Sequence, residues 1–98
     1  MIRRPVELHP EAETEAREAR HWYAERDAKA AAGFMAALDH AIELVAEAPE
    51  RWPLYLHETR RVLTRRYPFA VVYRVLADRV LVVAVAHRHK RPGYWRFR

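Results

Sequence analysis

The sequence of 98 residues contains no cysteine, only two glycines and no long apolar segment. The absence of cysteine excludes disulfide bonds and cysteine-ligated zinc, and it fits a reducing cytoplasm. The longest apolar run, Val80 to Ala86, is far too short to cross a bilayer as a helix. The basic N-terminus is not followed by the apolar stretch of a secretory signal. We therefore expect one globular domain, residues 1–98, in the cytoplasm and without a membrane partner.

Acidic residues are scarce in the second half of the chain. Residues 1–56 hold 7 Lys/Arg and 11 Asp/Glu, whereas residues 57–98 hold 11 Lys/Arg and only Glu58 and Asp78. The first half is therefore mildly acidic, and the positive charge that gives the chain its net +5 lies in the second half. This asymmetry indicates a polyanionic target or an acidic partner for the second half.

The first half has the residue spacing of a short strand followed by two helices. Val6 and Leu8 alternate with a charged residue, and Pro10 suits the first turn of a helix that should end near Arg26. Asp27 is the expected N-cap of a second helix, which Pro49 should stop at Ala48. With almost no connector between them, the two helices should form an antiparallel hairpin.

Three strands are expected in the second half, at residues 60–64, 69–76 and 80–86. The last is apolar at every position, so both of its faces should be covered and it should lie centrally in the sheet. The predicted order of elements is that of a two-layer α+β fold. The core candidates are Phe34, Leu38, Ile42, Val45, Val71, Tyr73 and Val82.

The segment from Arg60 to Val75 resembles the central hairpin of the RelE/ParE toxins, in which a basic strand precedes an aromatic-led strand ending in Tyr. The strand Val80 to His87, the basic run after it and Tyr94-Trp95 are similar to the last strand and tail of that family. The helical hairpin and its exit at Pro49 match in order and length. The resemblance spans nearly the whole chain and implies two N-terminal helices on a small antiparallel sheet.

The resemblance implies a growth-inhibiting toxin of a plasmid-stabilisation type of toxin–antitoxin system, neutralised by a cognate antitoxin. RelE-like members cut messenger RNA on the ribosome, whereas ParE-like members block DNA gyrase and are not nucleases. One sheet face and a basic rim should remain exposed in the lone toxin. We therefore expect the antitoxin to be an acidic, disordered segment that folds on this surface.

The basic strands and the tail supply groups that a metal-independent endoribonuclease requires: a base, an acid and phosphate-binding cations. The resemblance places His87, His89 and Tyr94 where RelE-like nucleases carry catalytic groups, and Arg65 where they carry a phosphate-binding arginine. The candidate residues for phosphate or target binding are Arg60, Arg61, Arg65, Arg66, Arg88, Lys90, Arg91 and Trp95. No third ligand accompanies the two histidines, so we expect neither a metal nor another cofactor.

Other features favour a ParE-like action. RelE-like nucleases carry a lysine pair in the loop before the basic strand, but residues 55–58 here contain no lysine, and arginine does not reproduce its geometry. The long alanine-rich hairpin is also more similar to ParE-like members. Whether the chain is an enzyme stays open at this point, with gyrase inhibition favoured over RNA cleavage.

Each candidate also has a structural alternative. The arginines of residues 60–66 can keep an edge strand soluble, and Tyr94 and Trp95 can pack as a lid on the open face of the sheet. His21 and His40 are expected on the helix surface. A further alternative function is a nucleic-acid-binding module without toxicity, whose binding should weaken steeply with salt.

Overall fold

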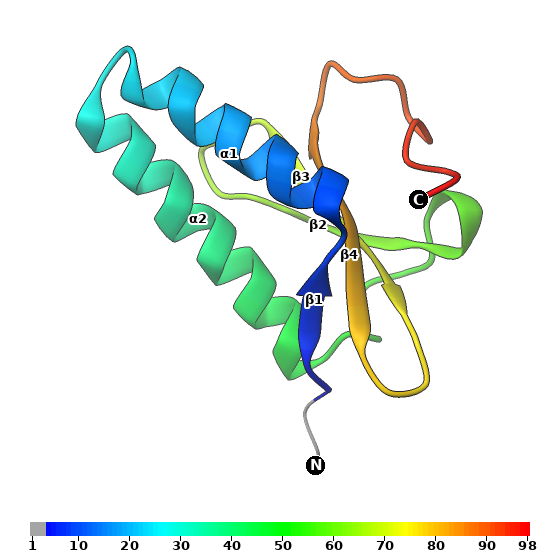
Figure 1. Cartoon of the computed structure of the whole chain (residues 1–98). Coiled ribbons are helices and arrows are strands. Elements are labelled where there is room, and N and C mark those ends of the chain that lie inside the picture. The colour runs from blue at the N-terminus through cyan, green and yellow to red at the C-terminus, as the bar shows by residue number, and fades with distance from the viewer. Residues whose placement is uncertain (1–3) are drawn as a thin grey trace.

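The computed structural model describes residues 4–98, so the first three residues of the expected domain lie outside it. A helical hairpin packs against one face of a four-stranded sheet (Figure 1). The elements in chain order are β1 (Val6–Leu8), α1 (Pro10–Ala24), α2 (Ala28–Glu47), the 3-10 helix η1 (Leu56–Glu58), β2 (Arg60–Leu63), β3 (Phe69–Val75) and β4 (Val80–His87). The predicted α+β fold is confirmed. Within residues 4–98, no helix has both the length and the apolar character that crossing a membrane requires.

The strand order in the sheet is β1-β4-β3-β2. β3 pairs antiparallel with β2 and with β4, as the short connections between these strands require. β1 pairs parallel with β4, so the sheet is mixed, whereas the resemblance had implied an antiparallel one. β1 is parallel to its partner because it pairs with β4, which follows it by about seventy residues in the chain. β4 lies between two strands, in the central position that its apolar sequence predicts.

Local sequence features begin and end both helices. The side chain of Asp27 accepts a hydrogen bond from the backbone N–H of Lys29 at 3.0 Å, which confirms it as the N-cap of α2. His9 caps α1 in the same way, since its Nδ1 accepts from the backbone N–H of Glu11 at 3.1 Å. α2 ends at Glu47 because Pro49 disfavours helical geometry in the preceding residue.

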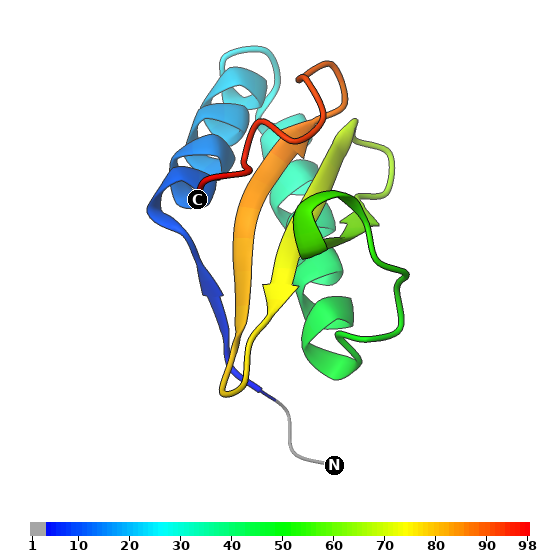
Figure 2. The same cartoon turned by 90° about the vertical axis from the view of Figure 1, so that its right-hand side faces the viewer.

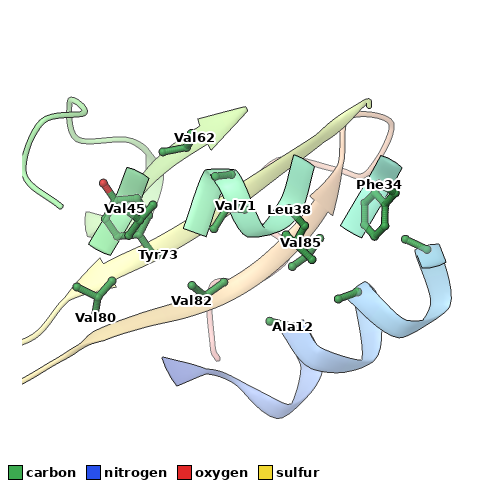
Figure 3. Close-up of a cluster of buried hydrophobic side chains, with 13 residues drawn as sticks. Ala12, Phe34, Leu38, Val45, Val62, Val71, Tyr73, Val80, Val82 and Val85 are labelled. Carbon is green, nitrogen blue, oxygen red and sulfur yellow. The ribbon is translucent and has the colours of Figure 1, made fainter. Parts of the chain in front are cut away.

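The main core lies between the helices and the sheet (Figure 3). Six of the seven core candidates are buried there, and Ile42 packs at the margin, half-buried. α1 contributes Ala12, Ala16 and Ala19, whose small side chains let the helix approach the sheet closely. The ring of Tyr73 is fully buried, yet its hydroxyl donates a hydrogen bond to the backbone carbonyl of Pro49. Burial raises the pKa of Tyr73 to about 12, although Arg60 and Arg51 act in the opposite direction.

Tyr67 fastens the loop between β2 and β3 to α2. Its hydroxyl donates to the backbone carbonyl of Ala30 at 3.0 Å, and its ring packs edge-on against Tyr23 and Phe34. Gly33 leaves the room for this hydroxyl, because a Cβ atom at position 33 would collide with it. A glycine inside a helix lowers helix stability, so the close approach of Tyr67 explains its presence.

Gly33→Ala is therefore expected to destabilise the protein by about 1–3 kcal/mol through overpacking. In a Tyr67→Phe background the colliding oxygen is gone, so the same substitution should stabilise the protein by up to about 1 kcal/mol through helix propensity. Urea denaturation of the four proteins measures both effects. Equal effects in the two backgrounds would show that the Tyr67 hydroxyl does not restrict position 33.

Candidate functional site

Two basic loops meet at one end of the sheet (Figure 2). The loop between β2 and β3 and the segment after β4 are joined by a hydrogen bond from the backbone N–H of Arg88 to the carbonyl of Pro68, at 2.8 Å. We call this region the basic end, defined by Arg65, Arg66, Arg88, Lys90 and Arg91, all of them exposed. The structure thus brings together five of the predicted phosphate- or target-binding residues.

A cleft of about 280 Å³ opens beside the basic end on the sheet face opposite the helices. Cationic side chains border it, aromatic rings form its walls, and small apolar residues of β3 and β4 form its floor. Its lining includes Tyr55, Arg61, Tyr67, Ala70, Val72, Ala86, His87, Arg88, Lys90, Tyr94 and Trp95. Of the residues to which the resemblance assigns chemistry, His87 and Tyr94 line the cleft, whereas His89 and Arg65 do not.

His87 and His89 stack on each other at the end of β4. Their ring centroids lie 5.0 Å apart, and Nδ1 of His87 accepts a hydrogen bond from the backbone N–H of His89 at 3.1 Å. Burial lowers the pKa of His87, and the neighbouring His89, Arg88 and Lys90 lower it further. His87 is therefore neutral near pH 7. Among residues 4–98, no group of three His, Cys, Asp or Glu side chains is placed to hold a metal ion.

The carboxylate of Glu15 on α1 holds the tail of the chain. Its Oε2 accepts a hydrogen bond from the Tyr94 hydroxyl at 2.6 Å, and its Oε1 accepts from Nη1 of Arg98 at 2.8 Å. Oε1 also accepts from the backbone N–H of Val85 in β4, at 3.0 Å. Only 17% of the Glu15 side chain is exposed. Burial and the bond to Glu15 raise the pKa of Tyr94 well above its ordinary value of 10.

The tail forms a hydrogen bond with an irregular part of β4. Val72 faces Ala84 in the register and Tyr73 faces Val82, so Val83 is the extra residue of a β-bulge. The carbonyl of Val83 accepts from Nη1 of Arg98 at 3.1 Å. β1 pairs with β4 only as far as Val82. Beyond that residue, side chains of α1 and the tail form hydrogen bonds with backbone groups at this edge of β4.

Trp95 lies under the tail and is 2% exposed. It packs on the second face of the sheet against Ala70, Val72 and Val83, which confirms the alternative that it is a lid. Its indole N–H has no hydrogen-bond partner among the described residues. The ring was also a candidate for target binding, but in this conformation it is not accessible to a target.

The remaining candidate arginines have different surroundings. The Arg60 guanidinium donates to the backbone carbonyls of Glu50 and Trp52, so it holds the loop after α2, and it is not among the residues that line the cleft. The Arg61 guanidinium lies 4.1 Å from the centre of the Tyr55 ring, at the cleft. His21 and His40 are exposed on the helices, as predicted.

Sequence reasoning missed Glu15, Arg98 and Tyr55. One observation pointed to Glu15: it lies three residues after Ala12 and four before Ala19, so it flanks the buried stripe of α1. A carboxylate beside a buried stripe needs a cation or a hydrogen-bond donor. Arg98 lies 83 residues further along the chain, and no local pattern connects the two.

Glu15→Gln is expected to destabilise the protein by about 2 kcal/mol, because charge-assisted hydrogen bonds to a partly buried group are lost. The pKa of Tyr94 should fall towards its ordinary value, since the carboxylate no longer favours the protonated phenol. Urea denaturation and an NMR titration of the Tyr94 ring test these effects. Glu13→Gln, an exposed position on the same helix, is the matched control. An unchanged Tyr94 titration in Glu15→Gln would contradict the assignment.

His87 should make stability depend on pH. Because its pKa in the folded state lies below the ordinary 6.5, the unfolded chain binds the proton first as the pH falls. Its contribution to stability is therefore present above pH 6.5 and is lost at lower pH. The free energy of unfolding, measured between about pH 7.5 and about pH 5.5, should decrease less in His87→Gln than in the unmodified protein. His40→Gln should keep the unmodified profile, and a profile of His87→Gln identical to it would refute this role.

Among solved structures, seven chains are similar to this one. One, described as the chromosomal ParDE TA system from P. aeruginosa, aligns with a TM-score of 0.75 and 12% sequence identity. The alignment covers 86% of this chain and 95% of that chain, and at this identity it supports the fold. No curated protein is detectably similar in sequence. The family model described as the ParE toxin of the type II toxin–antitoxin system parDE matches residues 6–92, and the chain therefore belongs to the ParE toxin family.

Proposed function

We propose that this chain arrests growth by inhibiting DNA gyrase, without cleaving nucleic acid, and that a cognate antitoxin neutralises it. Membership of the ParE toxin family supports the general assignment. The similar P. aeruginosa structure belongs to a ParDE toxin–antitoxin system, which supports the presence of an antitoxin.

The bond between Tyr94 and Glu15 carries the non-enzymatic part of the proposal. RNA cleavage without metal requires a group that gives a proton to the leaving oxygen. Tyr94 is one of the three candidates for proton transfer that the resemblance offers, with His87 and His89, but its hydroxyl donates to a carboxylate at 2.6 Å. Its raised pKa makes proton release still harder. The cleft therefore lacks a proton donor of suitable strength at this position.

The phosphate-binding part of a nuclease site is also incomplete. Arg60 is engaged by two backbone carbonyls, and residues 55–58 provide no lysine. His57 and Glu58 in that loop have positive φ angles of 55° and 61°, a backbone conformation that L-residues seldom adopt. The loop thus lacks the lysine pair and adopts an uncommon backbone conformation.

Exposed apolar side chains support binding of an antitoxin. Leu54 and Leu63 are 69% and 67% exposed, and Leu56 lies between them in the chain at 40%. Leu63 lines the cleft together with the cationic Arg61. A segment with apolar anchors and acidic flanks would bury the leucines and complement the cations, and opposite charge speeds association.

The second candidate function is RelE-like cleavage of messenger RNA, and His87 favours it. A neutral imidazole beside Arg88 and Lys90 in a cleft can act as a general base. This mechanism predicts cuts inside translated messages that disappear in His87→Gln.

Purified gyrase distinguishes the two functions. We expect the chain to block supercoiling by gyrase in the absence of ribosomes and to leave DNA relaxation by topoisomerase I unaffected. In cells, growth arrest should occur with intact messages and relaxed or damaged DNA. Arrest with cuts mapped inside translated messages, together with normal supercoiling by gyrase, would refute the proposal.

A further inference from the structure

Charges are segregated along the sheet. Between Thr59 and Arg98 the only acidic residue is Asp78, and it lies in the turn between β3 and β4. That turn is at the opposite end of the sheet from the basic end (Figure 2). The Asp78 carboxylate is moreover paired with Arg79 at 3.1 Å. No acidic residue of the stretch from Thr59 to Arg98 therefore lies at the basic end.

The cations of the basic end have no anionic partners within the described part of the chain. None of the five forms an ion pair with any carboxylate of residues 4–98. Three arginines elsewhere are engaged: Arg60 and Arg74 bind backbone carbonyls, and Arg98 binds Glu15. Like charges held together without counter-charges repel one another and raise the local potential. Such an arrangement favours a polyanionic ligand.

The geometry of the surface favours phosphate over a peptide carboxylate. Four of the five cations are arginines, whose planar guanidinium groups match phosphate oxygens. All five project from two loops and are exposed, and Arg65, Arg66 and Arg91 are not among the residues that line the apolar cleft. A peptide requires buried apolar anchors for affinity, whereas a polyphosphate chain binds through charge and the release of counterions alone.

The aromatic rings near these cations are already engaged, which disfavours unpaired bases. Binding of single strands depends on rings on which bases can stack. Here Trp95 is buried, Tyr67 is bonded to α2, and Tyr94 is bonded to Glu15. With Trp95, Tyr67 and Tyr94 engaged in this way, the phosphate-binding groups are better suited to a duplex, which presents its backbone outward.

We infer that the basic end binds the sugar–phosphate backbone of double-stranded DNA without reading its sequence. The inference goes beyond gyrase inhibition and does not depend on it. It would place the toxin on the same DNA on which gyrase acts.

The test is binding of the purified chain to a short fluorescent DNA duplex, followed by anisotropy from about 50 to about 200 mM salt. Arg65→Gln/Arg88→Gln removes one cation from each loop. Arg17→Gln/Arg20→Gln removes two exposed cations from α1 and is matched in net charge. Each lost phosphate contact lowers the slope of log K against log salt by about one, so the first variant should lower it by about two and the control by none.

Equal losses in the two variants would refute a localised site. Tighter binding of duplex RNA or single-stranded DNA would refute the assignment to duplex DNA. A polyglutamate peptide that competes as well as DNA of equal charge would instead identify an acidic protein as the ligand. Inhibition of gyrase is measured separately, so failure of DNA binding with gyrase still inhibited would leave the proposed function standing.

Discussion

β4 is apolar at every position from Val80 to Ala86, so water must be excluded from both of its faces. The helical hairpin covers one face, and Trp95 with the tail covers part of the other. Apolar burial contributes about 25 cal/mol per Å², so leaving either face open would be costly for a chain of this size. The layers of the fold and the course of the tail follow from this requirement.

The cover that Trp95 and the tail form on the second face depends on a single carboxylate, that of Glu15. The tail has no regular secondary structure, and the Trp95 indole N–H that it buries has no partner among residues 4–98. Glu15 holds the tail in place despite this, because its carboxylate accepts hydrogen bonds that join α1, β4 and two residues of the tail. The same bonds hold the Tyr94 phenol in its protonated form. The interaction that closes the fold thus also makes the Tyr94 phenol a weaker proton donor in the cleft.

The basic end has the opposite character, because none of its cations forms an ion pair with a carboxylate of residues 4–98. Like charges gathered in two adjacent loops cost stability through repulsion. Arg60, Arg74 and Arg98 show that arginine in this chain can be used for structure. The cations of the basic end form no such contacts with backbone carbonyls or carboxylates of the described residues, which is why we infer that they form a binding surface.

The sequence by itself determined the helices, the central strand and most of the core, because helix caps, apolar periodicity and a continuous apolar run are local properties. It also located the basic residues, since charge is read directly from composition. Only the tertiary structure decided the parallel pairing of β1, the burial of Trp95 and the bond between Glu15 and Tyr94. These features join residues about seventy or more positions apart, or a lid to the face that it covers. Such partners come together through the packing of the whole chain, and no local sequence pattern indicates them.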